Sequence, residues 1–317
     1  MKTVTPDYYK DFRCIADRCR HTCCVGWEID VDADSLARYQ QMGGPLGEKL
    51  RENIVLDDCP HFRLTKEERC PFLDGRGLCE LILQEGEGAL CQICTDHPRF
   101  RNQLAGREEL GLGLCCEAAA ALILGQREKT ALCVRQDDGR QEAPDPRGEA
   151  VLALREQVFA LLQDRSRPVM QRLDALLTEY GVRLPALSAA RWAELFLSLE
   201  RLDEDWGRRL EALRSAPDVP EVGREELELP LEQLAVYFVY RHLPAAQDGP
   251  EAKAALAFAV LSVQLIRRLY LLEPGGGEPE LAELARLYSS EIEYSEENTD
   301  ALLDLLWEEN AFLPEEE

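Results

Sequence analysis

The chain has 317 residues, of which 45% are hydrophobic and 30% are charged, and these proportions exclude a fibrous or wholly disordered protein. Its formal net charge of −24 argues against a partner bound through nucleic-acid phosphates, because lysine and arginine carry that binding. The same charge disfavours an anionic membrane surface. We therefore expect no nucleic acid and no membrane among its partners.

A lysine-bearing protein is the partner that an acidic surface attracts, although plain solubility also explains the acidity. The first residues, MKTVTPDYYKDFRC, lack the apolar core of a signal peptide. The longest apolar run, residues 254–266, is too short to span a bilayer and predicts a buried helix. We expect a cytoplasmic protein, in which thiols stay reduced.

The distribution of the cysteines predicts two domains, which the chain length allows. All twelve cysteines lie between Cys14 and Cys133. A polar stretch with proline and glycine follows, and residues 135–149 are predicted to form a linker. The expected domains are a cysteine-rich, metal- or cluster-binding domain over residues 1–134 and an α-helical domain over residues 150–317.

The first domain reads as irregular, with helices expected only over residues 34–53 and 114–125, the second ending at Gly125. In the second domain, apolar residues recur at the three- and four-residue spacing of amphipathic helices. These helices are predicted over residues 148–164, 168–181, 190–215, 230–243, 251–272, 279–292 and 299–309. The predicted fold is mainly α, with an irregular cysteine-rich metal-binding domain followed by an α-helical bundle.

Two groups of closely spaced cysteines predict a metal site. The groups are Cys14-x4-Cys19-x3-Cys23-Cys24 and Cys91-x2-Cys94. Each group lets two sulfurs reach one ion, and the loop between the groups brings the second to the first. Thiolates suit zinc and iron–sulfur clusters alike, so the spacing leaves the choice of metal open.

The other cysteines are less clearly placed. Adjacent cysteines are awkward joint ligands of one ion, so one member of each of the pairs 23–24 and 115–116 is expected to ligate. Cys59 and Cys70 are candidates of intermediate strength for metal ligands, whereas Cys133 is expected to pack as a small hydrophobic residue. Scattered core cysteines, a disulfide scaffold and a catalytic thiol are the alternatives to a metal site.

Common catalytic motifs are absent from the sequence. It contains no phosphate-binding P-loop, no G-x-G-x-x-G after a strand and no G-x-S-x-G elbow. In the segment VYFVYRHL, Tyr237, Tyr240, Arg241 and His242 crowd one predicted helix. A packed amphipathic helix explains this cluster, and a substrate or cofactor contact is the alternative.

Five segments, read in order, resemble the flagellin lysine-N-methylase family. The segments are PDYYKDFRCIADRCRHTCCVGWEIDVD, CPFLDGRGLCEL, LCQICTDHPRF, GLGLCCEAA and VYRHL. That family belongs to a broader group with a C-x2-C-x2-CC-type zinc- or iron-chelating motif, from which this chain departs in its spacings of four and three. The cysteine-rich part of the resemblance covers residues 5–125.

The resemblance implies a protein lysine N-methyltransferase that uses S-adenosylmethionine and acts on flagellin-like proteins. It also implies a [4Fe–4S] cluster on cysteines, with Zn²⁺ as the alternative metal. Carried onto this chain, the implied metal ligands are Cys14, Cys19, Cys23, Cys24, Cys79, Cys91, Cys94 and Cys115. The matching segment near the end of the fourth helix implies a functional, catalytic role for Tyr240, Arg241 and His242.

The usual glycine-rich loop for S-adenosylmethionine and the C-x3-C-x2-C motif of radical enzymes are both absent from the sequence. One hypothesis is that the cluster itself binds or orients the methyl donor. Two other functions compete with the enzyme. One is a non-catalytic zinc- or iron-binding module whose helical half docks a protein partner, and the other is a metal carrier.

Overall fold

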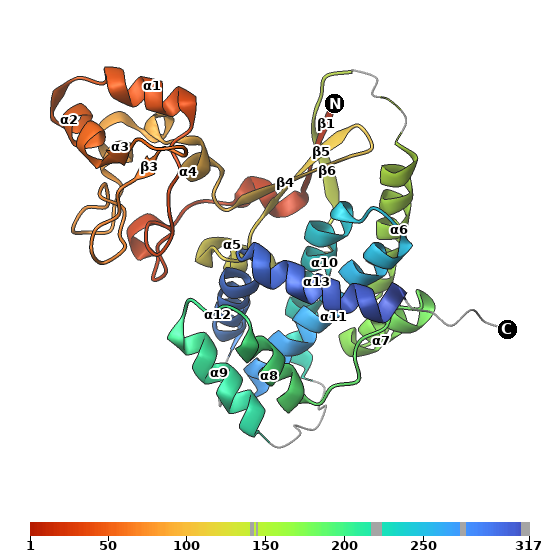
Figure 1. Cartoon of the computed structure of the whole chain (residues 1–317). Helices are drawn as coiled ribbons and strands as arrows, with labels where there is room; N and C mark the ends of the chain where they lie inside the picture. The colour runs from red at the N-terminus through yellow and green to blue at the C-terminus, as the bar shows by residue number, and fades with distance from the viewer. Residues whose placement is uncertain (140–142, 144, 217–223, 273–276, 312–317) are drawn as a thin grey trace. The chain divides into compact units, whose positions relative to one another are not determined.

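The computed structural model describes residues 1–139, 143, 145–216, 224–272 and 277–311. Two compact units make up the chain (Figure 1). The cysteine-rich unit is Arg13–Arg99, and the helical unit combines Met1–Phe12 with Phe100–Glu317. The contacts therefore divide the chain at other places than the boundary expected between residues 134 and 150.

Strand pairing explains where the units divide. The helical unit contains a sheet with strand order β4-β5-β1-β6. Its strands are β1 (Lys2–Pro6), β4 (Arg99–Leu104), β5 (Arg107–Leu112) and β6 (Leu132–Asp137). β1 pairs in parallel with β5 and antiparallel with β6. Because this pairing joins segments more than one hundred residues apart, the start of the chain belongs with residues that follow Arg99.

The stretch expected to be a linker, residues 135–149, is in part ordered structure. It contains the end of β6 and the start of α6 (Pro146–Leu162). Asp145 caps that helix, since one carboxylate oxygen accepts from Gly148 N at 2.8 Å and the other from Ala105 N at 2.8 Å. Residues 140–142 and 144 of the expected linker lie outside the described residues.

The cysteine-rich unit is built from short elements. They are α1 (Ala33–Gln41), α2 (Gly44–Asn53), β2 (Ile54–Val55), β3 (His61–Phe62), α3 (Glu80–Glu85) and α4 (Gln92–Asp96). The helix expected over residues 34–53 is broken in two at Gly44, whose φ of +73° is a left-handed conformation that glycine adopts without strain. Asp32 caps α1 through Ser35 N and also accepts from Gln92 N at 2.8 Å, which joins α1 to the start of α4.

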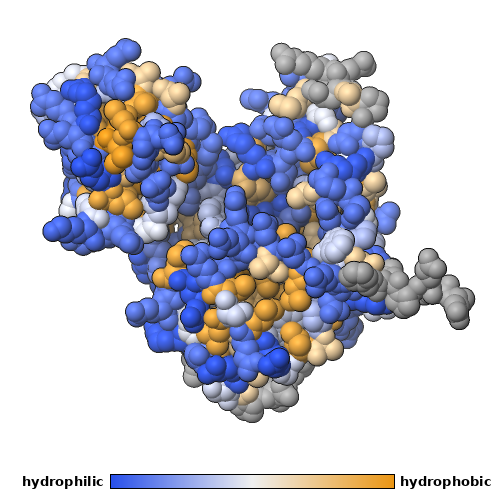
Figure 2. Space-filling model, in the orientation of Figure 1, coloured by the Kyte–Doolittle hydropathy of each residue, from blue (hydrophilic) through white to orange (hydrophobic). Residues whose placement is uncertain are grey.

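The helical unit confirms the mainly α prediction. Its helices are α5 (Glu117–Leu124), α6, α7 (Val169–Glu179), α8 (Ala189–Ser198), α9 (Glu204–Ser215), α10 (Glu228–His242), α11 (Gly249–Leu272), α12 (Glu278–Tyr288) and α13 (Glu296–Ala311). The interior of the unit is formed by α10 and α11, in which most residues are buried (Figure 1). On the viewed face, hydrophilic side chains predominate and surround scattered apolar patches (Figure 2).

Helix α11 contains the apolar run that the sequence predicts to be a buried helix. Among the described residues, it alone is long and apolar enough to cross a bilayer by length and composition. However, 78% of the qualifying window is buried inside the protein, and α11 packs against α10, α12 and α13. These contacts identify it as the central core helix of the unit.

The single helix expected over residues 190–215 is two helices, α8 and α9. The break between them is held by side chains from a distant segment. The Glu291 carboxylate accepts from Leu202 N at 3.0 Å and Asp203 N at 2.7 Å, and the Asn298 amide bonds both backbone groups of Glu200. Periodicity alone misses this break, because its cause is a tertiary contact.

A buried ion pair joins the sheet to the helices. Glu109 on β5 accepts from Arg155 on α6 in a bidentate contact, with nitrogen–oxygen distances of 2.5 and 2.7 Å. The two side chains are 0% and 2% exposed. Arg107 Nη2 lies 2.8 Å from the same carboxylate. Because a buried charge costs several kcal/mol unless it is paired, the seating of α6 against the sheet depends on this contact.

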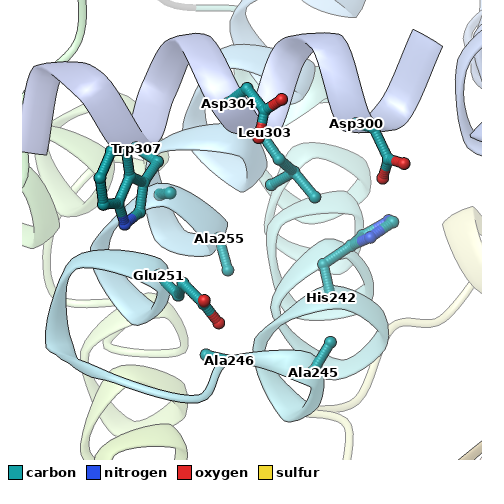
Figure 3. Close-up of a pocket in the computed structure, with 10 residues that line it drawn as sticks. His242, Ala245, Ala246, Glu251, Ala255, Asp300, Leu303, Asp304 and Trp307 are labelled. Atoms are coloured by element: carbon teal, nitrogen blue, oxygen red, sulfur yellow. The ribbon is translucent and has the colours of Figure 1, made fainter. Parts of the chain in front are cut away.

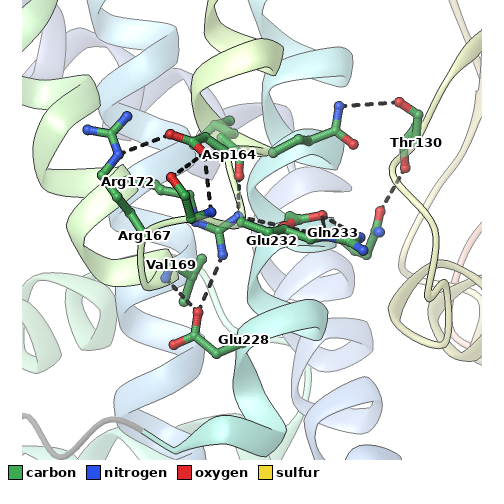
Figure 4. Close-up of polar contacts among 12 residues, drawn as sticks. Thr130, Asp164, Arg167, Val169, Arg172, Glu228, Glu232 and Gln233 are labelled. Carbon is green, nitrogen blue, oxygen red and sulfur yellow. Dashed lines mark hydrogen bonds and ion pairs between the residues drawn. The ribbon is translucent and has the colours of Figure 1, made fainter.

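A second buried network joins α7 to α10 (Figure 4). Arg172 Nη1 lies 2.5 Å from Glu232 Oε2, and Arg165 Nη2 lies 2.9 Å from Oε1 of the same buried carboxylate. The neighbouring Gln233 accepts from Thr130 Oγ1 at 2.7 Å. The polar side chains buried at the start of α10 are thus paired with residues from two other segments.

Replacing Glu109 with leucine is expected to lower the free energy of unfolding by about 3–5 kcal/mol, because Arg155 then stays buried without a carboxylate. Urea denaturation followed by circular dichroism measures this change. Glu194→Gln, which breaks the exposed pair with Arg191, is the control, and its expected cost is below about 1 kcal/mol. Equal costs for the two variants would contradict the role given to the buried pair.

Candidate functional site

Five cysteines of the cysteine-rich unit share one apolar core, which we call the thiol core. They are Cys24, Cys70, Cys79, Cys91 and Cys94. All five are thiols, not disulfides. Cys70 and Cys91 are buried, and the other three are partly buried. Their sulfurs are close enough to influence one another electrostatically.

Backbone contacts bring these cysteines together. Cys70 N donates to Cys24 O at 2.7 Å, next to a bridge between Val25 and Arg69. A second bridge, between Leu73 and Cys79, folds the following turn back on itself. Cys79 and Cys91 are the residues that immediately precede α3 and α4. Two turns and two helix starts therefore direct the thiols into one core.

The thiols of the core differ in acidity. A hydrogen bond from Cys94 lowers the pKa of Cys91, and the same bond, together with burial, raises the pKa of Cys94. A hydrogen bond from Cys23 lowers the pKa of Cys24 to about 7. Burial raises the pKa of Cys70 to about 12. Since the thiolate is the form that binds metals, Cys24 and Cys91 are the thiols best prepared to do so.

The thiol core contains four of the eight predicted metal ligands, Cys24, Cys79, Cys91 and Cys94. Cys70, which sequence reasoning left as an intermediate candidate, joins them through its burial. Cys14 and Cys23 are exposed, and Cys19 is partly exposed. Cys115 belongs to the helical unit.

The chemistry of the thiol core suits a thiophilic metal, since the core brings five sulfurs together. Within the described ranges, however, no three His, Cys, Asp or Glu side chains meet in an arrangement ready to hold a metal ion. The metal site therefore stays a prediction.

A second polar cluster lies in the helical unit around Glu293, and we call it the Glu293 cluster. The Glu293 side chain is 0% exposed, and its Oε1 lies 3.2 Å from Arg241 Nε and 2.7 Å from His242 Nε2. Tyr237 donates its hydroxyl to Oε2 at 3.0 Å and accepts from Arg241 Nη1 at 2.9 Å. Leu114 N also donates to the Tyr237 hydroxyl, at 3.2 Å.

Local helix geometry assembles the Glu293 cluster. Tyr237 and Arg241 are four residues apart on α10, so their side chains share one face of the helix. Glu293 is the last residue of a π-helix, Ser289–Glu293, that continues α12. Such π-helices are rare and occur often at functional sites.

The Glu293 cluster holds a neutral histidine against an ionised carboxylate. Burial by itself raises the pKa of Glu293, but Arg241 and His242 outweigh burial and hold that pKa below its ordinary value. Burial lowers the pKa of His242. Because a carboxylate only accepts hydrogen bonds, His242 Nε2 carries the proton and Nδ1 is left as an acceptor. This is the arrangement in which a histidine acts as a general base oriented by a carboxylate.

Of the three predicted catalytic residues, Arg241 and His242 belong to the Glu293 cluster and Tyr240 does not. The Tyr240 hydroxyl donates to Leu110 O at 3.1 Å, and its ring lies 5.2 Å from the Arg155 guanidinium. Tyr240 therefore anchors α10 to the sheet. Cys115, a predicted ligand, forms a hydrogen bond with Tyr294, and burial raises the pKa of its thiol to about 12.

Sequence reasoning missed Glu293. The residue lies in the segment SSEIEYSEEN, where several acidic residues follow one another. Two of these acids, Glu291 and Glu293, are buried, and no local pattern marks them. Only its contacts with α10 distinguish Glu293. The adjacent Arg241 and His242 indicate that a buried acid lies opposite them. Which acid this is becomes clear only when the fold is known.

Stability is expected to fall as the pH drops below about 6.5, because the unfolded chain protonates His242 near its ordinary pKa of 6.5 while the folded chain keeps it neutral. The pKa of Glu293 is also lowered, so this carboxylate stabilises the folded chain at pH values above its ordinary pKa. That contribution is lost as the pH falls through the pKa of Glu293 in the folded chain.

His242→Gln removes the first of these contributions. Urea midpoints at about pH 7.5 and about pH 5.5 should therefore change less for the variant than for the wild-type protein. Equal changes in the two proteins would show that His242 is not held neutral.

Three curated proteins from Salmonella are similar to this chain, each 27% identical over 142 residues, or 42% of the chain. They are the flagellar biosynthetic protein FliU of Salmonella muenchen and the lysine-N-methylases of Salmonella choleraesuis and Salmonella typhimurium. The match covers 84% of FliU but only 35% of each lysine-N-methylase. No family model matches the chain, and no solved structure matches it. The resemblance to flagellin lysine-N-methylases, first seen in the cysteine-rich segments, is thereby confirmed.

Proposed function

We propose that this chain is an S-adenosylmethionine-dependent protein lysine N-methyltransferase that acts on flagellin-like substrates and carries a cysteine-ligated [4Fe–4S] cluster. The similarity to two proteins named lysine-N-methylase carries the proposal. Two features of the structure support it. They are the thiol core in one unit and the Glu293 cluster in the other.

The thiol core is the part of the chain that would hold the cluster. Cys24, Cys79, Cys91 and Cys94 are the proposed ligands, and Cys70 is a fifth sulfur in the same core. When bound, the cluster supplies an iron site at which the methyl donor can be oriented. The apolar residues packed around the thiols exclude water from the site and keep the sulfurs in place.

The Glu293 cluster is the part of the chain that would activate the substrate. A lysine ammonium has to lose its proton before its nitrogen can attack the methyl group. In the proposed step the Nζ lone pair forms the new carbon–nitrogen bond, the carbon–sulfur bond of the sulfonium breaks, and S-adenosylhomocysteine leaves. His242 takes the proton at Nδ1, and Glu293 stabilises the imidazolium that forms.

Methyl transfer to flagellin should depend on His242 and not on the Tyr240 hydroxyl. With purified protein, flagellin and methyl-labelled S-adenosylmethionine, His242→Gln is expected to lower kcat by about 100-fold or more, the usual contribution of a general base. Tyr240→Phe, which removes only the hydroxyl that bonds Leu110 O, is expected to keep its activity. No label on flagellin lysines with the metal-loaded wild-type protein would contradict the proposed function.

Metal content tests the thiol core separately. Protein purified without oxygen is expected to contain iron and sulfide, and the double variant Cys91→Ser, Cys94→Ser should lose most of both. Cys59→Ser is the control, because Cys59 is exposed and lies outside the thiol core. Zinc in place of iron, with no methyl transfer, would favour the non-catalytic metal-binding module.

A further inference from the structure

A pocket of about 420 Å³ lies in the helical unit beside the Glu293 cluster (Figure 3). It is lined by the end of α10, the start of α11 and one face of α13. Its volume lies within the usual range of ligand-binding pockets. His242 is one of the lining residues, so the pocket opens directly onto the proposed base.

The walls of the pocket are partly apolar. Ala254 and Ala255 of α11 are buried, and Leu303 of α13 is partly buried. Trp307 lies one turn further along α13 and is 38% exposed. Figure 3 shows Trp307 at one end of the pocket and His242 with Asp300 at the other. The apolar surface therefore extends from the tryptophan towards the histidine.

The charged residues of the pocket are all acidic. Glu251, Asp300 and Asp304 line it, and none of the lysines and arginines that the structure describes does. In the part of the chain that the structure describes, Asp300 and Asp304 form no ion pair. They are four residues apart on α13, where like charges repel each other. The pocket thus gathers negative charge that the described residues do not neutralise, next to apolar walls.

A primary ammonium group on an aliphatic chain matches these features. The methylene groups of such a ligand gain from contact with alanine, leucine and tryptophan side chains. The cationic end gains from the carboxylates. A carboxylate or phosphate ligand would be repelled, and an uncharged chain would gain nothing from the exposed aspartates.

We propose that this pocket receives the substrate lysine, with its methylene chain along Ala255 and Leu303 and its ammonium group between Asp300 and His242. The proposal rests on the proposed function, which it extends by naming the site that selects the substrate. Asp300 and Asp304 are then specificity-determining residues that draw in the cationic side chain. Trp307 contacts the part of the lysine nearest the substrate backbone.

Binding of Nα-acetyl-lysine methylamide to the full chain tests the pocket without any methyl transfer. The indole signal of Trp307, assigned with Trp307→Phe, is followed by NMR during titration. The double variant Asp300→Asn, Asp304→Asn is expected to weaken binding by about 10-fold, because two carboxylates that attract the ammonium are lost. The norleucine analogue, which has no amine, is expected to leave the Trp307 signal unchanged.

The matched control is Glu297→Gln, Glu308→Gln, which makes the same change of charge on exposed positions of α13 outside the pocket lining. If this control weakens binding of the lysine compound as much as the aspartate double variant does, the effect comes from net charge alone and the proposal is overturned. An unchanged Trp307 signal with the lysine compound would also overturn it, as would equal binding of the norleucine analogue.

The methylation assay separates the pocket from the proposed function. If wild-type protein methylates flagellin and the aspartate double variant does so equally well, the pocket proposal fails and the function stands. If the lysine compound binds as expected but flagellin is not methylated, the pocket proposal is supported and the function fails.

Discussion

The buried carboxylate of Glu293 is the contact on which the proposed chemistry depends. A carboxylate removed from water is unstable unless charged or polar groups pair with it. Arg241, His242 and Tyr237 supply these groups from α10. Arg241 and His242 keep Glu293 ionised, and the ionised carboxylate in turn fixes the tautomer of His242. Because the buried Glu293 has to be paired, His242 is held neutral beside it, and its Nδ1 is left as an acceptor at the edge of a pocket.

In the proposed function, each unit of the chain contributes a different kind of chemistry. In the cysteine-rich unit, paired turns and the residues before α3 and α4 direct five thiols into one apolar core. In the helical unit, α10 and the π-helix after α12 assemble a proton-accepting pair, and α13 adds carboxylates and an indole beside it. Methyl transfer to an amine requires both a held donor and a deprotonated lysine, and these two requirements match the two sets of residues.

Much of the fold follows from local patterns, whereas the contacts between distant segments do not. Apolar periodicity predicts α10 and α11, because each is a continuous helix with buried residues along its length. It misses the break between α8 and α9, which Glu291 and Asn298 hold from elsewhere in the chain. Cys91 and Cys94 are recognisable from their spacing, but Cys70 becomes a member of the thiol core only through the pairing of its segment with that of Cys24. Glu293 is unrecognisable in an acidic segment until the helices that enclose it are known.

The protonation state of His242 decides whether Glu293 prepares this histidine to accept a proton. Nitrogen NMR of the intact protein labelled at its four histidines, with His242→Gln used for assignment, reports which ring nitrogen carries a proton. We expect a neutral imidazole protonated at Nε2 that stays neutral as the pH falls below the ordinary histidine value of 6.5. An imidazolium at neutral pH, or a neutral ring protonated at Nδ1, would contradict it.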